Sequence, residues 1–201
     1  MFEIGRLDGE FEMPHIDFRG YSEDCLIRGL LDVPDDLRLT DFLNTADVYS
    51  VHDASLFALE DGRSVPAGTQ ELAAQDVWAV EPTDSSLRAE LHIPTRAVQV
   101  ELELPPYRVT GFLHGVNTGD PVAVVHRRRR MIPLTEAVIE FTFAGRTKRR
   151  RTNVLIVNRD RATSLRRIAY ETSKLDEFEL PPIDARARDL TGAIVFDREP
   201  Q

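Results

Sequence analysis

The chain of 201 residues contains a single cysteine, Cys25, which excludes an intramolecular disulfide framework and any cysteine-rich metal site. No stretch approaches the roughly 18 consecutive apolar residues that a membrane-spanning helix requires. The first residues have neither the basic segment nor the apolar core of a secretory signal. Together these absences predict a protein of a reducing, bacterial-type cytoplasm, without a membrane partner.

The signatures of the common enzyme classes are also lacking. There is no nucleophile elbow, phosphate-binding loop, dinucleotide fingerprint or paired-histidine zinc helix. The histidines are not spaced as metal ligands, and His52 and Asp53 are neighbours on a predicted strand, so their side chains would point to opposite faces. Cys25 has no basic neighbour, which favours a half-buried thiol over a nucleophile. We therefore predict a non-enzymatic protein with no catalytic residue, cofactor or bound metal.

Charge is distributed unevenly along the chain, whose formal net charge is −9. Residues 1–104 carry 22 acidic and 7 basic side chains, residues 105–167 carry 4 and 14, and residues 168–201 carry 8 and 4. The basic charge is concentrated in two runs, 127–130 (RRRR) and 148–151 (KRRR). This asymmetry points to an anionic partner. It would equally let the basic part attract the acidic part of its own chain or of another copy.

The sequence contains an internal repeat, visible as apolar positions and glycines that recur in the same order. Its clearest anchor is a glycine within a short apolar segment, where Gly29 of the first copy meets Gly111 of the second. The aligned segments are 27–31 with 109–113 at an offset of 82, 48–56 with 131–139 at an offset of 83, and 77–80 with 154–157 at an offset of 77.

Each copy is predicted to be a unit of four to five short β-strands. Residues 98–104 alternate between apolar and polar side chains, which is the period of a half-buried strand, and the prolines at 105–106 end that strand. Gly29 and Gly111 indicate a bulge or sharp bend. A unit of about 70 residues buries only a marginal core, so the two copies are expected to pack together.

Other segments are assigned individually. Residues 39–44 predict a single helical turn, whereas the equivalent stretch of the second copy, 121–125, predicts a strand. Residues 165–175 predict a weak amphipathic helix and residues 191–197 a last strand. The C-terminal segment 168–201 is predicted to be an extended tail, because its apolar clusters are separated by prolines and acidic residues.

The fold prediction is therefore an all-β protein with minor helix. It consists of an acidic unit at 14–88, a basic unit at 95–167 and a tail at 168–201.

Four segments carry a recognisable pattern: IRGLL at 27–31, RLTDFLN at 38–44, PLTEAV at 133–138 and VLIVNRD at 154–160. They resemble a family of small bacterial single-domain β proteins of uncharacterised function, with the family's pattern divided here between two copies. The resemblance covers about two thirds of the chain. It implies small β-barrels of the SH3- or Sm-like kind and brings no catalytic residues. The arginine runs lie outside the family's pattern.

The two basic runs form the candidate binding site. Four consecutive arginines in a strand would place two guanidinium groups on each face, so the first run is expected at a strand start, an edge or a loop. The two runs could meet at adjacent strand ends as one patch. The candidate partner-binding residues are Arg127, Arg128, Arg129, Arg130, Lys148, Arg149, Arg150 and Arg151.

Three interpretations of this patch remain open: contact with an acidic protein surface or another copy, binding of RNA, DNA or a nucleotide, and a solvated edge that opposes aggregation. The nearest aromatic residues, Tyr107, Phe141 and Phe143, follow a core pattern, which disfavours base stacking. The run 127–130 also resembles the start of PilZ domains, which bind cyclic dinucleotides, but their Asp/Asn-x-Ser-x-x-Gly element is missing. We interpret the chain as an accessory or scaffold protein, with nucleic-acid or nucleotide binding as the alternative.

Overall fold

A computed structural model describes the greater part of the chain, which divides into units 1–169 and 170–201; every described residue belongs to the first unit. Arg127, Arg128 and the predicted tail beyond residue 168 lie outside the described residues. The described residues are 15–34, 36–82, 95–116, 120–123, 125 and 129–168.

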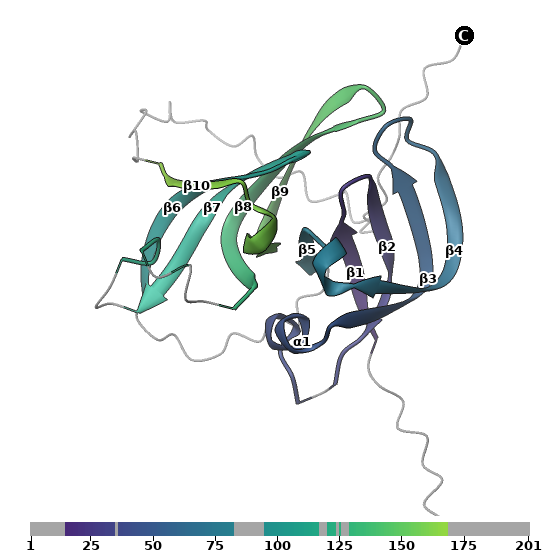
Figure 1. Cartoon of the computed structure of the whole chain (residues 1–201), viewed down its shortest axis with the longest axis horizontal. Helices are drawn as coiled ribbons and strands as arrows, with labels where there is room; N and C mark the ends of the chain where they lie inside the picture. Colours follow the sequence, from purple (N-terminus) through teal and green to yellow (C-terminus); the bar gives the residue numbers. More distant parts are fainter. Residues whose placement is uncertain are drawn as a thin grey trace, which may run out of the picture. The chain divides into compact units, whose positions relative to one another are not determined.

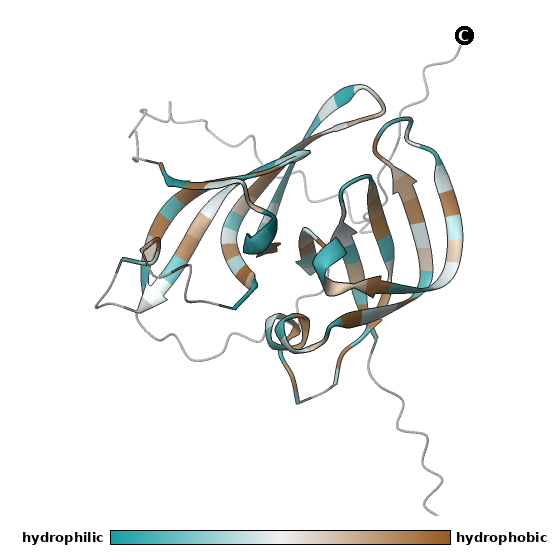
Figure 2. Cartoon of the chain, in the orientation of Figure 1, coloured by the Kyte–Doolittle hydropathy of each residue, from teal (hydrophilic) through white to brown (hydrophobic). Residues whose placement is uncertain are grey.

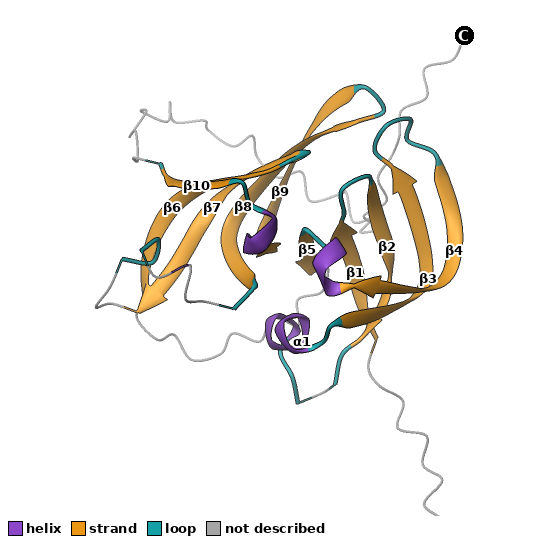
Figure 3. Cartoon of the chain, in the orientation of Figure 1, coloured by secondary structure: helices purple, strands orange, loops and turns teal. Residues whose placement is uncertain are grey.

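The structure is mostly β, as predicted, and its helices are short connections between strands (Figure 3). Within the described residues, no helix is long and apolar enough to span a membrane. The strands are β1 (His15–Tyr21), β2 (Cys25–Asp32), β3 (Val48–Ala58), β4 (Ser64–Ala73), β5 (Ala79–Pro82), β6 (Thr95–Leu104), β7 (Tyr107–Val116), β8 (Met131–Phe143), β9 (Arg146–Asn158) and β10 (Ser164–Arg167). The helices are α1 (Leu39–Thr45), η1 (Ala74–Asp76) and η3 (Arg159–Arg161).

All ten strands join one antiparallel sheet in the order β10-β6-β7-β8-β9-β5-β1-β2-β3-β4 (Figure 1). We call β1–β5 the first half and β6–β10 the second half. Each half has the same internal order, with its fifth strand beside its first and its fourth strand outermost. The sheet is open, because its outer strands β10 and β4 are not paired with each other. Two separate closed barrels are therefore not confirmed.

A glycine-centred irregularity recurs at the same place in both halves. The register between β2 and β3 shifts around Gly29, and the register between β7 and β8 shifts around Gly111. Opposite these glycines, Asp53 and Glu136 adopt positive φ angles of 49° and 48°. A Cβ at Gly29 would clash with the bulged neighbouring strand, and a Cβ at Gly111 would lie in tight contact with it.

The predicted alignment of the last strands is wrong. The repeat predicted from the sequence aligns 77–80 with 154–157, but residues 154–157 belong to β9, the fourth strand of the second half. The counterpart of β5 is β10: each follows a short 3₁₀ helix and pairs with the first strand of its half. The two segments are paired neighbours, Ala79 with Val157 and Val80 with Ile156. Both are apolar because both lie in the centre of the sheet.

Two further predictions are corrected by the described residues. Positions 121–123 form a turn, so the strand predicted at 121–125 is absent there. The helix predicted at 165–175 is wrong at its described start, because β10 pairs with β6 over Ser164–Arg167, and residues 169–175 lie outside the described residues. Pairing with an available sheet edge outweighs the weak helical periodicity of this segment.

Each half has its own apolar core, and each core takes in a few side chains of the other half. The predicted alternation is present in β6, where hydrophobic and hydrophilic residues alternate along the strand (Figure 2). Val98, Val100, Leu102 and Leu104 are buried, and the polar residues between them are partly exposed. One apolar cluster combines these side chains with residues of the first half, including Trp78. A second cluster lies in the first half and takes in Met131 and Ile156 from the second. Each half is small, and the two cores are joined by these shared side chains.

Polar side chains also fasten one half to the other. The Asn44 amide at the end of α1 donates to the Met131 carbonyl at 2.9 Å and accepts from the Met131 N–H at 2.8 Å. Asn158 is 1% exposed and donates to the Val77 carbonyl at 3.0 Å. These bonds satisfy backbone groups where β8 and β9 meet the first half.

Candidate functional site

The structure does not bring the two basic runs together as one patch. Arg129 and Arg130 immediately precede β8, whose first residue Met131 pairs with Asn158. Lys148 pairs with Phe141, ten residues further along the same two strands. At about 3.3 Å per residue this is roughly 33 Å of strand. The described parts of the two runs therefore lie toward opposite ends of the β8–β9 hairpin.

The first run contacts the helix of the first half. The Arg129 guanidinium lies 3.3 Å from the Asp41 carboxylate on α1. Arg130 donates to the Ala46 carbonyl at 3.4 Å, just beyond the end of α1. These contacts lie beside the Asn44–Met131 bonds, so this end of the run is part of the junction between the halves.

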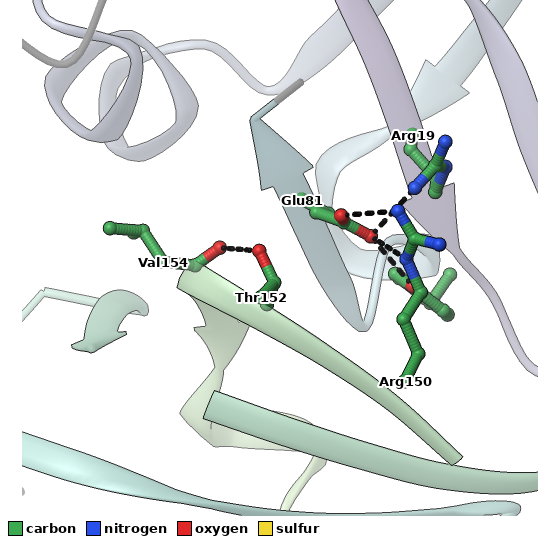
Figure 4. Close-up of polar contacts among 6 residues, drawn as sticks. Arg19, Glu81, Arg150, Thr152 and Val154 are labelled. Atoms are coloured by element: carbon green, nitrogen blue, oxygen red, sulfur yellow. Dashed lines mark hydrogen bonds and ion pairs between the residues drawn. The ribbon is translucent and has the colours of Figure 1, made fainter. Parts of the chain in front are cut away.

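The second run contributes to a buried ion cluster centred on Glu81 of β5 (Figure 4). Arg150 of β9 donates two hydrogen bonds to the Glu81 carboxylate, at 2.6 and 2.7 Å. Arg19 of β1 donates at 3.0 Å and the Tyr21 hydroxyl at 3.1 Å. The side chains of Glu81 and Arg19 are only 6% and 11% exposed, whereas that of Arg150 is 37% exposed. The carboxylate is thus fully occupied in holding three strands together.

Burial changes the acidity of the tyrosines around this cluster. Removal from water raises the pKa of Tyr21 far above its ordinary value of 10.0, and the Glu81 carboxylate raises it further. Burial also raises the pKa of Tyr107, whose hydroxyl donates to the Ser22 carbonyl at 2.6 Å. Both hydroxyls therefore remain protonated donors at neutral pH.

We expect these two tyrosines to make the protein less stable as the pH rises above about 10. Their pKa is raised in the folded state, so the unfolded state binds fewer protons at alkaline pH, and the free energy of unfolding falls. The stabilisation is fully present below about pH 10 and is lost above it, by about 1 kcal/mol per pH unit for each tyrosine. Urea unfolding between about pH 8 and about pH 11 measures this.

The variant Tyr21→Phe is the control, because it should lose part of the pH dependence. Tyrosinate absorbance that develops fully before the chain unfolds would contradict the assignment.

The opposite face of β9 carries charges of alternating sign. Arg149 pairs with Glu140 at 3.1 Å, and Arg108 pairs with Glu103 at 2.9 Å. In the ladder Glu140 stands directly between Arg108 and Arg149. This row across β6, β7, β8 and β9 therefore alternates in charge, and it does not form a uniformly basic surface.

Lys148 and Arg151 are the remaining members of the second run. Both side chains are exposed, and neither forms an ion pair with any residue in the described part of the chain. Of the predicted binding residues that are described, these two are therefore available to a partner.

The predicted stacking candidates are buried. Tyr107 is 2% exposed, and Phe141 and Phe143 are 8% and 9% exposed. The rings of Tyr107 and Phe141 pack 5.7 Å apart. Their faces are therefore covered by protein and cannot receive nucleic-acid bases.

Sequence reasoning missed a histidine cluster on β1–β4. The His52 Nε2 lies 2.8 Å from Asp32, its Nδ1 lies 3.3 Å from the Thr69 hydroxyl, and His15 lies 2.6 Å from Asp32. The partner of His52 is thus Asp32 on the adjacent strand β2. It could not be identified by considering Asp53, the neighbour of His52 in the sequence. No group of three side chains positioned to hold a metal ion occurs among the described residues.

A groove of about 500 Å³ lies beside Cys25 and Trp78 in the first half. Its apolar wall is flanked by acidic residues, and Arg161 lies over the Trp78 ring at 5.8 Å. Burial raises the pKa of the Cys25 thiol, and Ser22 lies 3.1 Å from its sulfur. A raised pKa reduces the thiolate population, so this cysteine is a weak nucleophile at neutral pH.

Comparisons of the chain with family models, with curated proteins and with solved structures find no match. Its function is therefore inferred from the geometry of the sheet and its charges.

Proposed function

We propose that this protein is a non-enzymatic accessory or scaffold protein that assembles through complementary acidic and basic surfaces, with another copy as its partner. One observation carries the proposal: acidic–basic recognition already joins the two halves of the chain. Among the residues that the structure describes, three ion pairs connect a base of the second half to an acid of the first, namely Arg150–Glu81 at 2.6 Å, Arg129–Asp41 at 3.3 Å and Arg161–Asp76 at 3.7 Å.

The charges that remain are suited to a contact between copies. Lys148 and Arg151 are exposed on the second half. Asp53, Glu60 and Glu71 are exposed on the first half and form no ion pair within the described ranges. Exposed pairs contribute only about 0–1 kcal/mol each, so these charges would orient a partner more than hold it.

Binding of RNA, DNA or a nucleotide through the basic residues is less well supported. Arg149 and Arg150, which the sequence offers as phosphate ligands, are already bound to Glu140 and Glu81. The neighbouring aromatic rings are buried. A phosphate backbone would meet carboxylates along the same row of the sheet, which opposes binding.

We further infer that the two halves are copies of one SH3- or Sm-like unit, fused into a single sheet. The shared strand order, the paired glycine bulges and the 3₁₀ helix before each fifth strand support this. A cytoplasmic location remains part of the proposal and is supported by the single free cysteine.

Replacing Lys148 and Arg151 by serine should weaken self-association at low salt without lowering the melting temperature. The reason is that both side chains are exposed and make no ion pair in the described part of the molecule. Sedimentation velocity at low and high salt measures the association, and calorimetry checks the fold.

The matched control is the double variant Glu140→Ser with Arg149→Ser, which removes a paired acid and base and keeps the net charge. It should associate as the wild type does. A wild-type protein that stays monomeric at low salt would contradict the proposal. Binding of a fluorescent single-stranded RNA that weakens steeply with salt would favour the nucleic-acid alternative.

A further inference from the structure

The two outer strands of the sheet, β4 and β10, are the kinds of strand that pair with each other where the two halves meet. In the described residues β4 pairs only with β3, and β10 pairs only with β6. β4 is ten residues long, and its Val65 is 57% exposed. Its first part is interrupted by Pro66 and by register shifts around Gly68, whereas Gln70–Ala73 pair with β3 in unbroken register and include one charged residue, Glu71. The outer edge of such a regular segment is a template for pairing with another strand.

The internal junction shows how two such edges fit. Where the halves meet, β9 pairs antiparallel with β5, so the fourth strand of one half joins the fifth strand of the other. In the described part of the sheet, the edges without a partner strand are those of the other fourth strand, β4, and the other fifth strand, β10. The same kind of junction is therefore available between molecules.

We propose that copies of this chain join head to tail, with β10 of one copy pairing antiparallel with β4 of the next. The inference rests on the proposed self-assembly and adds a backbone contact between two strand edges to the charged contacts named above. Because the two edges are different, the contact is heterologous, and repetition gives closed rings or open filaments.

The equivalence of the halves fixes the register of this contact. Equivalent residues at the end of the two halves are 85 positions apart in the sequence: η1 corresponds to η3, and β5 corresponds to β10. At the same offset, the residues of β4 correspond to those of β9. The internal pairs Ala79–Val157 and Val80–Ile156 then translate into two intermolecular pairs. They are Ser164 opposite Leu72 of the next copy, and Leu165 opposite Glu71 of the next copy.

The ion cluster of Glu81, Arg19 and Arg150 at the internal junction has no complete equivalent at the outer edges of the described sheet. The counterpart of the Arg19–Glu81 pair is the pair between Glu101 and Arg166, with the charges exchanged. Arg166 remains 69% exposed. By the same equivalence, the position of Arg150 on β9 corresponds to Val65 on β4. The contact between copies is therefore weaker than the internal one, which suits reversible assembly.

Disulfide trapping between copies tests the register. In a Cys25→Ser background, the single variants Ser164→Cys and Leu72→Cys are mixed and oxidised. Directly opposite residues of an antiparallel pair lie about 4.5–5.5 Å apart at Cα, within reach of a disulfide. The expected result is a cross-linked dimer in the mixture and none from either variant alone.

The matched control mixes Ser164→Cys with Val65→Cys, an exposed position of β4 that lies out of register, and should give no cross-link. Cross-linking of Leu72→Cys with itself would show a symmetric contact between two β4 strands and overturn the proposal. So would salt-dependent association without the expected cross-link, although the proposed function would then survive. A chain that never associates would overturn both.

Discussion

Replacing Glu81 by glutamine is expected to lower the free energy of unfolding by about 3–5 kcal/mol, the largest effect of any single polar substitution proposed for this protein. The carboxylate accepts from Arg19, Tyr21 and Arg150 in a nearly dry environment. Glutamine keeps the shape but loses the charge, so the buried Arg19 guanidinium is left without compensation. Urea unfolding at neutral pH measures the change.

Two control variants separate this cluster from ordinary surface pairing. Arg166→Gln removes the cation at the equivalent position of the second half, where the side chain is 69% exposed, and should cost about 0–1 kcal/mol. Arg150→Met should cost less than Glu81→Gln, because Arg19 still neutralises Glu81. If Glu81→Gln unfolds at the same urea concentration as the wild type, the cluster does not hold the halves together.

The role of Arg150 was out of reach of sequence reasoning for a physical reason. Its partner Glu81 lies 69 residues away and becomes its neighbour only because β5 pairs with β9. What the sequence does contain is the imbalance between an acidic first half and a basic second half. That imbalance predicts attraction between the two parts, but it does not indicate which arginines pair and which remain exposed.

The predicted alignment of the repeat is correct where the backbone geometry constrains the residue type. It is wrong where the match depends on hydrophobicity alone. Gly29 and Gly111 match because each faces a bulge that leaves little room for a side chain. The apolar runs 77–80 and 154–157 look alike because each is central in the sheet, and they are neighbours across the junction. Two segments with similar hydrophobicity lie in similar environments. This is true of strands that are equivalent in a repeat, and it is also true of strands that pair with each other.

Alanine at Gly29 is expected to destabilise the protein more than alanine at Gly111, so that each half of the chain serves as the control for the other. A Cβ at Gly29 would lie 2.5 Å from the His52 carbonyl oxygen and 2.6 Å from the Val51 side chain. Since a backbone oxygen cannot move without disturbing β3, Gly29→Ala should cost about 3 kcal/mol or more.

At Gly111 the nearest atoms would lie 3.2 Å away, at Leu134 and at the Thr135 carbonyl. A shift of a few tenths of an ångström relieves that contact, so Gly111→Ala should cost only about 1 kcal/mol. Thermal and urea unfolding of the two variants under the same conditions measure the difference. Equal losses, or a larger loss at Gly111, would show that the two bulges are not packed as the structure has them. The bulge of the first half is the tighter of the two, and it holds β2 against β3 next to the outer strand β4, where the proposed contact between copies begins.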